Sequence, residues 1–208
     1  MIMRHLAVLV EEPSMEEFLR ILLPRLLPED CGFDIHSFRG KANLLRNLKA
    51  RLRGYARWLP DDWRVIVVVD LDNDDCRALK GKREEAATAA GLRTRSQAGS
   101  GRWQLANRIA IEELETWYFG DWQAVRSAYP RVSEGVSRQA RYRNPDAIRG
   151  TWEAFERILQ RRGYFATGLR KVEAARAVAV HIDPDRNRSE SFNAFRAAVV
   201  EAIPHGVP

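Results

Sequence analysis

The acidic residues with the clearest chemical meaning follow a run of branched apolar residues. Residues 64–70 read RVIVVVD, and the acidic stretch at 70–75 reads DLDNDD. Such an apolar run is typical of a strand buried on both faces in a parallel sheet. Ligand sites in open α/β sheets lie just past the carboxyl ends of the strands. Asp70 and Asp72 lie two residues apart, so in an extended backbone both side chains point the same way.

Two converging carboxylates repel each other unless a proton or a cation lies between them. Mg²⁺ prefers oxygen ligands of this kind. Asp70 and Asp72, with Asp74 as a further ligand, therefore predict a site for Mg²⁺ or Mn²⁺. The alternative is a solvated acidic turn in front of the next helix, where aspartate is common.

A second acidic pair, Glu11 and Glu12, follows the apolar residues 6–10. If the first and third strands are neighbours in a parallel sheet, Glu11 lies near Asp70. Ser14 is predicted to begin the next helix and to form a capping box with Glu17. The N–H groups of that helix would then offer a site for phosphate in the same crevice. Alternatively, the two glutamates only complement the helix dipole.

A third cluster, formed by Glu112, Glu113 and Glu115, ends another strand candidate. In a helix only Glu112 and Glu115 would share a face, whereas in an extended segment Glu113 and Glu115 would do so. The sequence leaves both conformations open. These glutamates either supplement a metal site or begin a helix.

Basic residues line one face of a helix predicted at 43–59, opposite a leucine-rich face. The basic face consists of Arg46, Lys49, Arg53 and Arg57. Regular positive charge suits a phosphate backbone, and the chain carries 34 Lys and Arg against 28 Asp and Glu. The basic segment at 138–143 is a second candidate for nucleic-acid contact. A solvated helix surface is the alternative for the first segment, and a disordered hairpin for the second.

Strand-like and helix-like segments alternate in the first half of the chain. Strands are predicted at 5–10, 33–38, 64–70 and 102–111, and helices at 14–26, 43–59 and 75–90, with a loop at 97–101. This alternation indicates an α/β fold with a mostly parallel sheet. The second half predicts helices near 121–128, 151–162, 169–180 and 189–202. Residues 1–120 are expected to form the core, and 121–208 a helical elaboration packed on it within a single structural domain.

Composition narrows the class of protein. The chain has 208 residues, of which 45% are hydrophobic, so it can bury a sizeable core. Two cysteines argue against a disulfide framework and a cysteine-based zinc site. The chain shows no apolar run of roughly 18 residues, so no membrane span and a cytoplasmic location are expected. The glycine-rich loop at 99–101 lacks the lysine and threonine of a phosphate-binding P-loop.

Several short motifs occur along most of the chain in a fixed order. They are VEEPSMEEFL at 10–19, DLDNDDC at 70–76 followed by LK at 79–80, ELETW at 113–117 followed by GD at 120–121, Lys171 after Tyr164, and RS at 188–189 before Phe192. Together these motifs resemble a bacterial family, the domain-of-unknown-function 4276 family of the TOPRIM-like group.

The resemblance implies a TOPRIM-like fold, a small parallel sheet with helices on both faces. In TOPRIM proteins a glutamate after the first strand and a DxD pair after a later strand bind magnesium and act on phosphodiester bonds. Glu11, Asp70 and Asp72 match these positions. The sequence departs from the family pattern at Glu12, where the family has glycine, and at Met15, where an acidic residue is common.

The leading hypothesis is a magnesium-dependent phosphodiesterase, most simply a nuclease. Glu113 or Glu115 would complete the metal shell or act as a base, and Lys171 would neutralise phosphate charge. The resemblance further implies a separate ATPase partner in phage defence. Two alternatives remain: a non-catalytic binding subunit, favoured by Glu12, and a DxD phosphatase or phosphotransferase.

Overall fold

The computed structural model describes residues 4–99 and 101–203, and within them the chain forms a four-stranded, all-parallel sheet. The strand order is β2-β1-β3-β4. The strands are β1 (His5–Val10), β2 (Gly32–Ser37), β3 (Trp63–Asp70) and β4 (Leu105–Ala110). All four agree closely with the predicted ranges, and the α/β fold class is confirmed. The sheet is consistent with a TOPRIM-like fold.

The two central strands, β1 and β3, pair directly and in parallel, with Val10 beside Val68. In β3 every residue after Trp63 is buried. Branched apolar side chains fill both faces of such a strand, because helices cover the sheet on both sides. The carboxyl ends of β1 and β3 therefore meet at one edge of the sheet.

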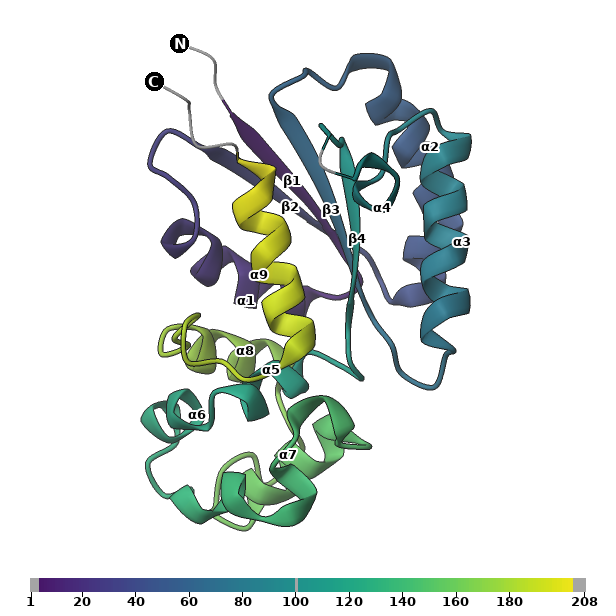
Figure 1. The fold of residues 1–208 in the computed structure, drawn as a ribbon. Coiled ribbons are helices and arrows are strands. Elements are labelled where there is room, and N and C mark those ends of the chain that lie inside the picture. The colour runs from purple at the N-terminus through teal and green to yellow at the C-terminus, as the bar shows by residue number, and fades with distance from the viewer. Residues whose placement is uncertain (1–3, 100, 204–208) are drawn as a thin grey trace.

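Helices cover both faces of the sheet (Figure 1). On one face lie α2 (Lys41–Trp58) and α3 (Cys76–Ala89), and on the other α1 (Pro13–Leu22) and α9 (Glu190–Ala202). Leu44, Leu48 and Leu52 of α2 pack in one core cluster with alternate residues of β1 and β3. The opposite cluster joins α1 and α9 to the other face of the same strands.

The helices between β4 and α9 gather beyond the carboxyl edge of the sheet (Figure 1). They are α5 (Glu115–Gly120), α6 (Trp122–Ala128), α7 (Thr151–Gln160) and α8 (Lys171–Ala179). Between α6 and α7 lie the short 3₁₀ turns Glu134–Arg138, Ala140–Tyr142 and Pro145–Ala147. One hydrophobic cluster runs from the sheet into this part of the chain, through Trp117, Tyr118 and Phe155. Residues 204–208 of the predicted elaboration lie outside the described residues.

Two helix starts differ from the sequence predictions. The predicted capping box of Ser14 and Glu17 is wrong, because α1 begins one residue earlier, at Pro13, and Ser14 lies inside the first turn. Glu17 instead forms an ion pair with Arg176 at 2.7 Å. The loop predicted at 97–101 includes the end of a short helix, α4 (Arg95–Ala98), which a Thr94–Gln97 capping box begins. Ser100 of that loop lies outside the described residues.

The first helix is also shorter than its predicted range of 14–26. It ends at Leu22, and the 3₁₀ turn Leu23–Arg25 follows it. Pro24 lies in this turn, and proline lacks the N–H that a continuing α-helix would use. None of the helices in the described part of the chain is long and apolar enough to cross a membrane.

Candidate active site

A pair of buried carboxyl groups lies where β1 and β3 end. The backbone N–H of Asp70 donates a hydrogen bond to Oε2 of Glu11 at 3.2 Å. Glu11 is 8% exposed and Asp70 is 4% exposed. The parallel pairing of the two strands brings these residues together although 59 positions separate them in the sequence.

The electrostatics of this pair disfavour negative charge. Burial raises the pKa of the Glu11 carboxyl to about 7, although the hydrogen bond from Asp70 and the charge of Lys41 oppose the shift. Burial also raises the pKa of Asp70 well above its usual range, and the nearby charges of Glu11, Glu12 and Glu115 add to this effect. Buried like charges need a shared proton or a bound cation.

Asp72 and Asp74 lie in a different environment from Asp70. The strand ends at Asp70, and Asp72 takes a left-handed backbone conformation with φ 49°. The extended geometry that predicted parallel side chains at Asp70 and Asp72 therefore does not continue past the strand. Lys41 at the start of α2 bonds Asp72 at 2.7 Å, Asp74 at 2.8 Å and the carbonyl of Leu71 at 3.1 Å.

The lysine at position 41 was missed at the sequence level. Burial lowers the pKa of Lys41, but its hydrogen bonds to Asp72 and Asp74 outweigh burial and raise the pKa overall. Lys41 follows Gly40, whose backbone N–H bonds the carbonyl of Glu11 at 3.0 Å. Lys41 follows the strand next to β1, so its place at the site can be predicted only once the strand order is known.

The three glutamates after β4 do not form one site, because they contact different parts of the chain. Glu112 accepts hydrogen bonds from the Gly150 N–H at 2.6 Å and from Arg149 at 2.8 Å. Glu113 accepts from the Thr151 hydroxyl at 2.7 Å and the Trp152 N–H at 3.0 Å. Both glutamates therefore stabilise the start of α7.

Of the three, Glu115 is the one whose charge acts on the buried Asp70. It is 2% exposed, and burial raises its pKa to about 7. The chain bends at 111–114, and α5 begins at Glu115. The segment is therefore neither wholly helical nor wholly extended, the two conformations considered from the sequence.

We call Glu11, Asp70, Asp72, Asp74 and Glu115 the carboxylate cluster. Lys171 and Tyr118 lie around it. Nζ of Lys171 lies 3.6 Å from Oε1 of Glu12. Burial lowers the pKa of Lys171, but the charges of Glu115 and Glu12 raise it by more. Tyr118 is fully buried, and its hydroxyl has no hydrogen-bond partner among the described residues. Sequence reasoning missed Tyr118, which lies one turn after Glu115 in α5.

The oxygen ligands of the site fit a hard divalent cation. Within residues 4–99 and 101–203, no group of three or more acidic, histidine or cysteine side chains is arranged to hold a metal ion. Mg²⁺ is usually bound through one or two carboxylates, several waters and the phosphates of the substrate, and it does not require a complete protein cage. The Glu11–Asp70 pair supplies that minimum, whereas Lys41 holds Asp72 and Asp74.

An open pocket of about 410 Å³ adjoins the cluster. Asp72, Glu112, Glu113, Arg149 and Trp152 are among the residues that line it. The Arg149 side chain is 81% exposed. The pocket reaches the site at Asp72, whereas Glu11, Asp70 and Glu115 are not among the residues that line it.

The basic face of α2 is solvent-exposed. Its members are Arg46, Lys49, Arg53 and Arg57, and none of them forms an ion pair with another described residue. The helix starts with Lys41 at the carboxylate cluster and leads away from it. At 1.5 Å per residue, Arg57 lies about 24 Å along the axis from Lys41.

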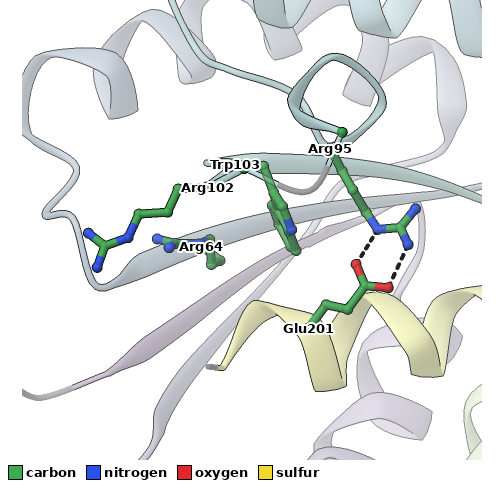
Figure 2. Close-up of a pocket in the computed structure, with 7 residues that line it drawn as sticks. Arg64, Arg95, Arg102, Trp103 and Glu201 are labelled. Atoms are coloured by element: carbon green, nitrogen blue, oxygen red, sulfur yellow. Dashed lines mark hydrogen bonds and ion pairs between the residues drawn. The ribbon is translucent and has the colours of Figure 1, made fainter. Parts of the chain in front are cut away.

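A second pocket, of about 450 Å³, lies at the opposite edge of the sheet (Figure 2). Arg95 is paired there with Glu201 through two bonds of 2.5 Å. Arg64 donates to the carbonyls of Asp61 and Trp63, both at 2.6 Å. Since Arg64 lies near the start of β3 and Asp70 ends it, this pocket is separate from the carboxylate cluster.

The fold and the cluster define a class: a parallel α/β protein with buried acidic residues at the carboxyl edge of its sheet. The chain belongs to the family described as Domain of unknown function (DUF4276), whose match covers residues 10–199. No curated protein and no solved structure matches the chain.

Proposed function

We propose that this protein is a metal-dependent enzyme that cleaves phosphodiester bonds, a nuclease that uses Mg²⁺ or Mn²⁺. The observation that carries the proposal is the buried Glu11–Asp70 pair at the meeting point of β1 and β3. Burial raises the pKa of both carboxyl groups. A bound cation would compensate the charge of the ionised pair, so the site favours a cation of high charge density.

Each residue of the cluster has a separate role in this proposal. Glu11 and Asp70 would hold the cation, which when bound supplies Lewis-acid activation of the phosphate and of a water molecule. Glu115, with a pKa of about 7 because of burial, is suited to accept or return a proton near neutral pH. Lys171 would neutralise charge on the phosphate.

The proposed substrate is a nucleic acid, either DNA or RNA. The chain carries a net charge of +6, and the exposed residues Arg46, Lys49, Arg53 and Arg57 give α2 a continuous basic face. Contacts of this kind bind the phosphate backbone without reading sequence. A separate ATPase partner in phage defence is part of the proposal and rests on the resemblance alone.

One observation favours a second candidate, a binding subunit that keeps the fold without catalysis. Lys41 already neutralises Asp72 and Asp74, and Glu12 stands beside Lys171, where an incoming phosphate would need room. Under this alternative the lysines take the place of the metal permanently.

Cleavage of labelled DNA and RNA, single- and double-stranded, with Mn²⁺ or Mg²⁺ separates the two candidates. The enzyme proposal expects metal-dependent cleavage that Asp70→Asn abolishes. Glu85→Gln, which removes a negative charge from the exposed surface of α3, is the matched control and should cleave like the wild type. Intact substrate with the wild-type protein under all these conditions would favour the binding subunit.

A further inference from the structure

A basic pocket in the helical part of the chain lies outside the carboxylate cluster. Its volume is about 570 Å³, within the range of small-molecule sites. Four arginines line it, together with Asp121 and Trp122 near the start of α6; we call it the arginine pocket, and its arginines are Arg138, Arg143, Arg186 and Arg188.

Two of these arginines are neutralised and two are not. Arg186 donates to the buried carboxylate of Asp121 through Nε at 2.8 Å and through Nη2 at 2.9 Å. Arg138 forms an ion pair with Glu134. The guanidinium groups of Arg143 and Arg188 are exposed, and neither has an acceptor or a carboxylate partner among the described residues.

The backbone that carries Arg186 and Arg188 is fixed against α5. The N–H of Arg188 bonds the carbonyl of Gly120 at 3.0 Å, and the Asn187 side chain donates to the carbonyl of Trp117 at 2.9 Å. A Cβ atom at Gly120 would lie 2.0 Å from Oδ1 of Asn187, so this approach requires glycine. The backbone at Arg188 is therefore positioned before any ligand arrives, which lowers the entropic cost of binding.

We propose that the arginine pocket binds a phosphate group. A carboxylate is satisfied by one bidentate guanidinium, whereas a phosphate has further oxygens for a second. Arg143 and Arg188 supply two uncompensated guanidinium groups, and Arg186, paired with Asp121, lines the same pocket. The phosphate belongs either to a nucleic-acid backbone or to a free nucleotide. The proposal does not depend on the proposed nuclease activity, because binding requires neither the carboxylate cluster nor a metal.

Binding is tested in EDTA with Asp70→Asn as the background, so that cleavage plays no part. The probes are a short labelled single-stranded oligonucleotide, ADP and inorganic phosphate. The test variant combines Arg143→Gln and Arg188→Gln. The matched control combines Arg161→Gln and Arg162→Gln, two exposed arginines in the same part of the chain that do not line the pocket. Melting temperatures establish that both variants are folded.

The expected result is a loss of affinity of about tenfold or more in the test variant for at least one probe, with the control unchanged. A loss restricted to the oligonucleotide assigns the pocket to a nucleic-acid backbone, and a loss that includes ADP or inorganic phosphate assigns it to a free phosphate compound. Equal affinities of the test variant and the background protein for every probe, or no binding of any probe by the background protein, would overturn the proposal.

Discussion

The carboxylate cluster has two parts that differ in burial and in the charges around them, although both include residues of one short acidic motif. The inner carboxylates, Glu11, Asp70 and Glu115, are buried, and burial raises the pKa of each. The outer carboxylates, Asp72 and Asp74, have side chains 44% and 51% exposed and are paired with Lys41. Hydrogen bonding to Lys41 lowers the pKa of Asp74.

The difference shows which carboxylates lack a basic partner. The outer carboxylates are already neutralised by a lysine, whereas no lysine or arginine of the described residues lies within 4.0 Å of a carboxylate oxygen of Glu11, Asp70 or Glu115. The local backbone decides between the two environments, because the strand ends at Asp70 and the chain turns outward at Asp72.

The largest effect is expected on the rate of cleavage, which should distinguish the inner from the outer carboxylates. Asp70→Asn should lower the rate of cleavage by at least about 100-fold, since loss of a metal ligand removes several kcal/mol of transition-state stabilisation. Asp74→Asn should retain most of the rate, because Lys41 and not the metal holds Asp74. Initial rates of cleavage with Mn²⁺ measure the activity of both variants. Equal loss in the two variants would show that the inner and outer carboxylates act as one group.

In metal-free buffer the pH dependence of stability should report the raised pKa of the inner carboxylate Glu115. Because the pKa of Glu115 is raised from 4.5 to about 7, the native state keeps a proton that the unfolded state has released between these values. The free energy of unfolding should therefore fall as the pH rises through this window. In the Glu115→Gln variant, this decrease in the free energy of unfolding should be smaller by up to about 3 kcal/mol.

Urea unfolding in EDTA at about pH 5 and about pH 8 measures this effect. Glu85→Gln on the exposed surface of α3 controls for the loss of one negative charge. If wild type and Glu115→Gln lose the same stability between the two pH values, Glu115 does not titrate as the burial of its side chain requires.

A smaller effect is expected at Lys41, which links the two parts. Lys41→Gln should tighten Mg²⁺ binding several-fold, since the variant removes a positive charge that stabilises Asp72 and Asp74 and acts on Glu11. The variant should lose about 1 kcal/mol of stability, because the partner aspartates are exposed. Metal titration monitored by calorimetry provides the test, and weaker binding in the variant would make Lys41 part of the metal site.

The smallest effect on the cluster is expected from the basic face of α2. Alanine at Arg46, Lys49, Arg53 and Arg57 should leave metal binding unchanged and shift stability by only about 0.5 kcal/mol per site. Affinity for nucleic acids should fall similarly across sequences, and the salt slope for duplex DNA should fall by about one unit per lost contact. Identical salt slopes in wild type and variant would remove α2 from the binding surface.

The sequence predicted the sheet and the meeting of Glu11 with Asp70, because both rest on strong patterns. Residues 64–70 form a continuous apolar run, and parallel strands bring their carboxyl ends to one edge. Repeating leucines at helical spacing likewise located α2, where Leu48 and Leu52 are buried.

The rest of the site depends on contacts between distant segments. Glu112 and Glu113 hold the start of α7, at 150–152, which no local pattern around 112 indicates. The left-handed turn at Asp72 follows from how the chain leaves β3, and Lys41 reaches the site only because β2 neighbours β1. Sequence spacing alone therefore overstated the similarity of Asp70 and Asp72.

Calorimetric titration with Mg²⁺ and with Mn²⁺ at about pH 8 measures whether the inner carboxylates bind a cation at all. The structure predicts that the wild type and Asp74→Asn bind the metal, whereas Glu11→Gln and Asp70→Asn do not. Absence of binding in the wild type, or equal affinity in Asp70→Asn, would contradict the assignment of the Glu11–Asp70 pair as a metal site.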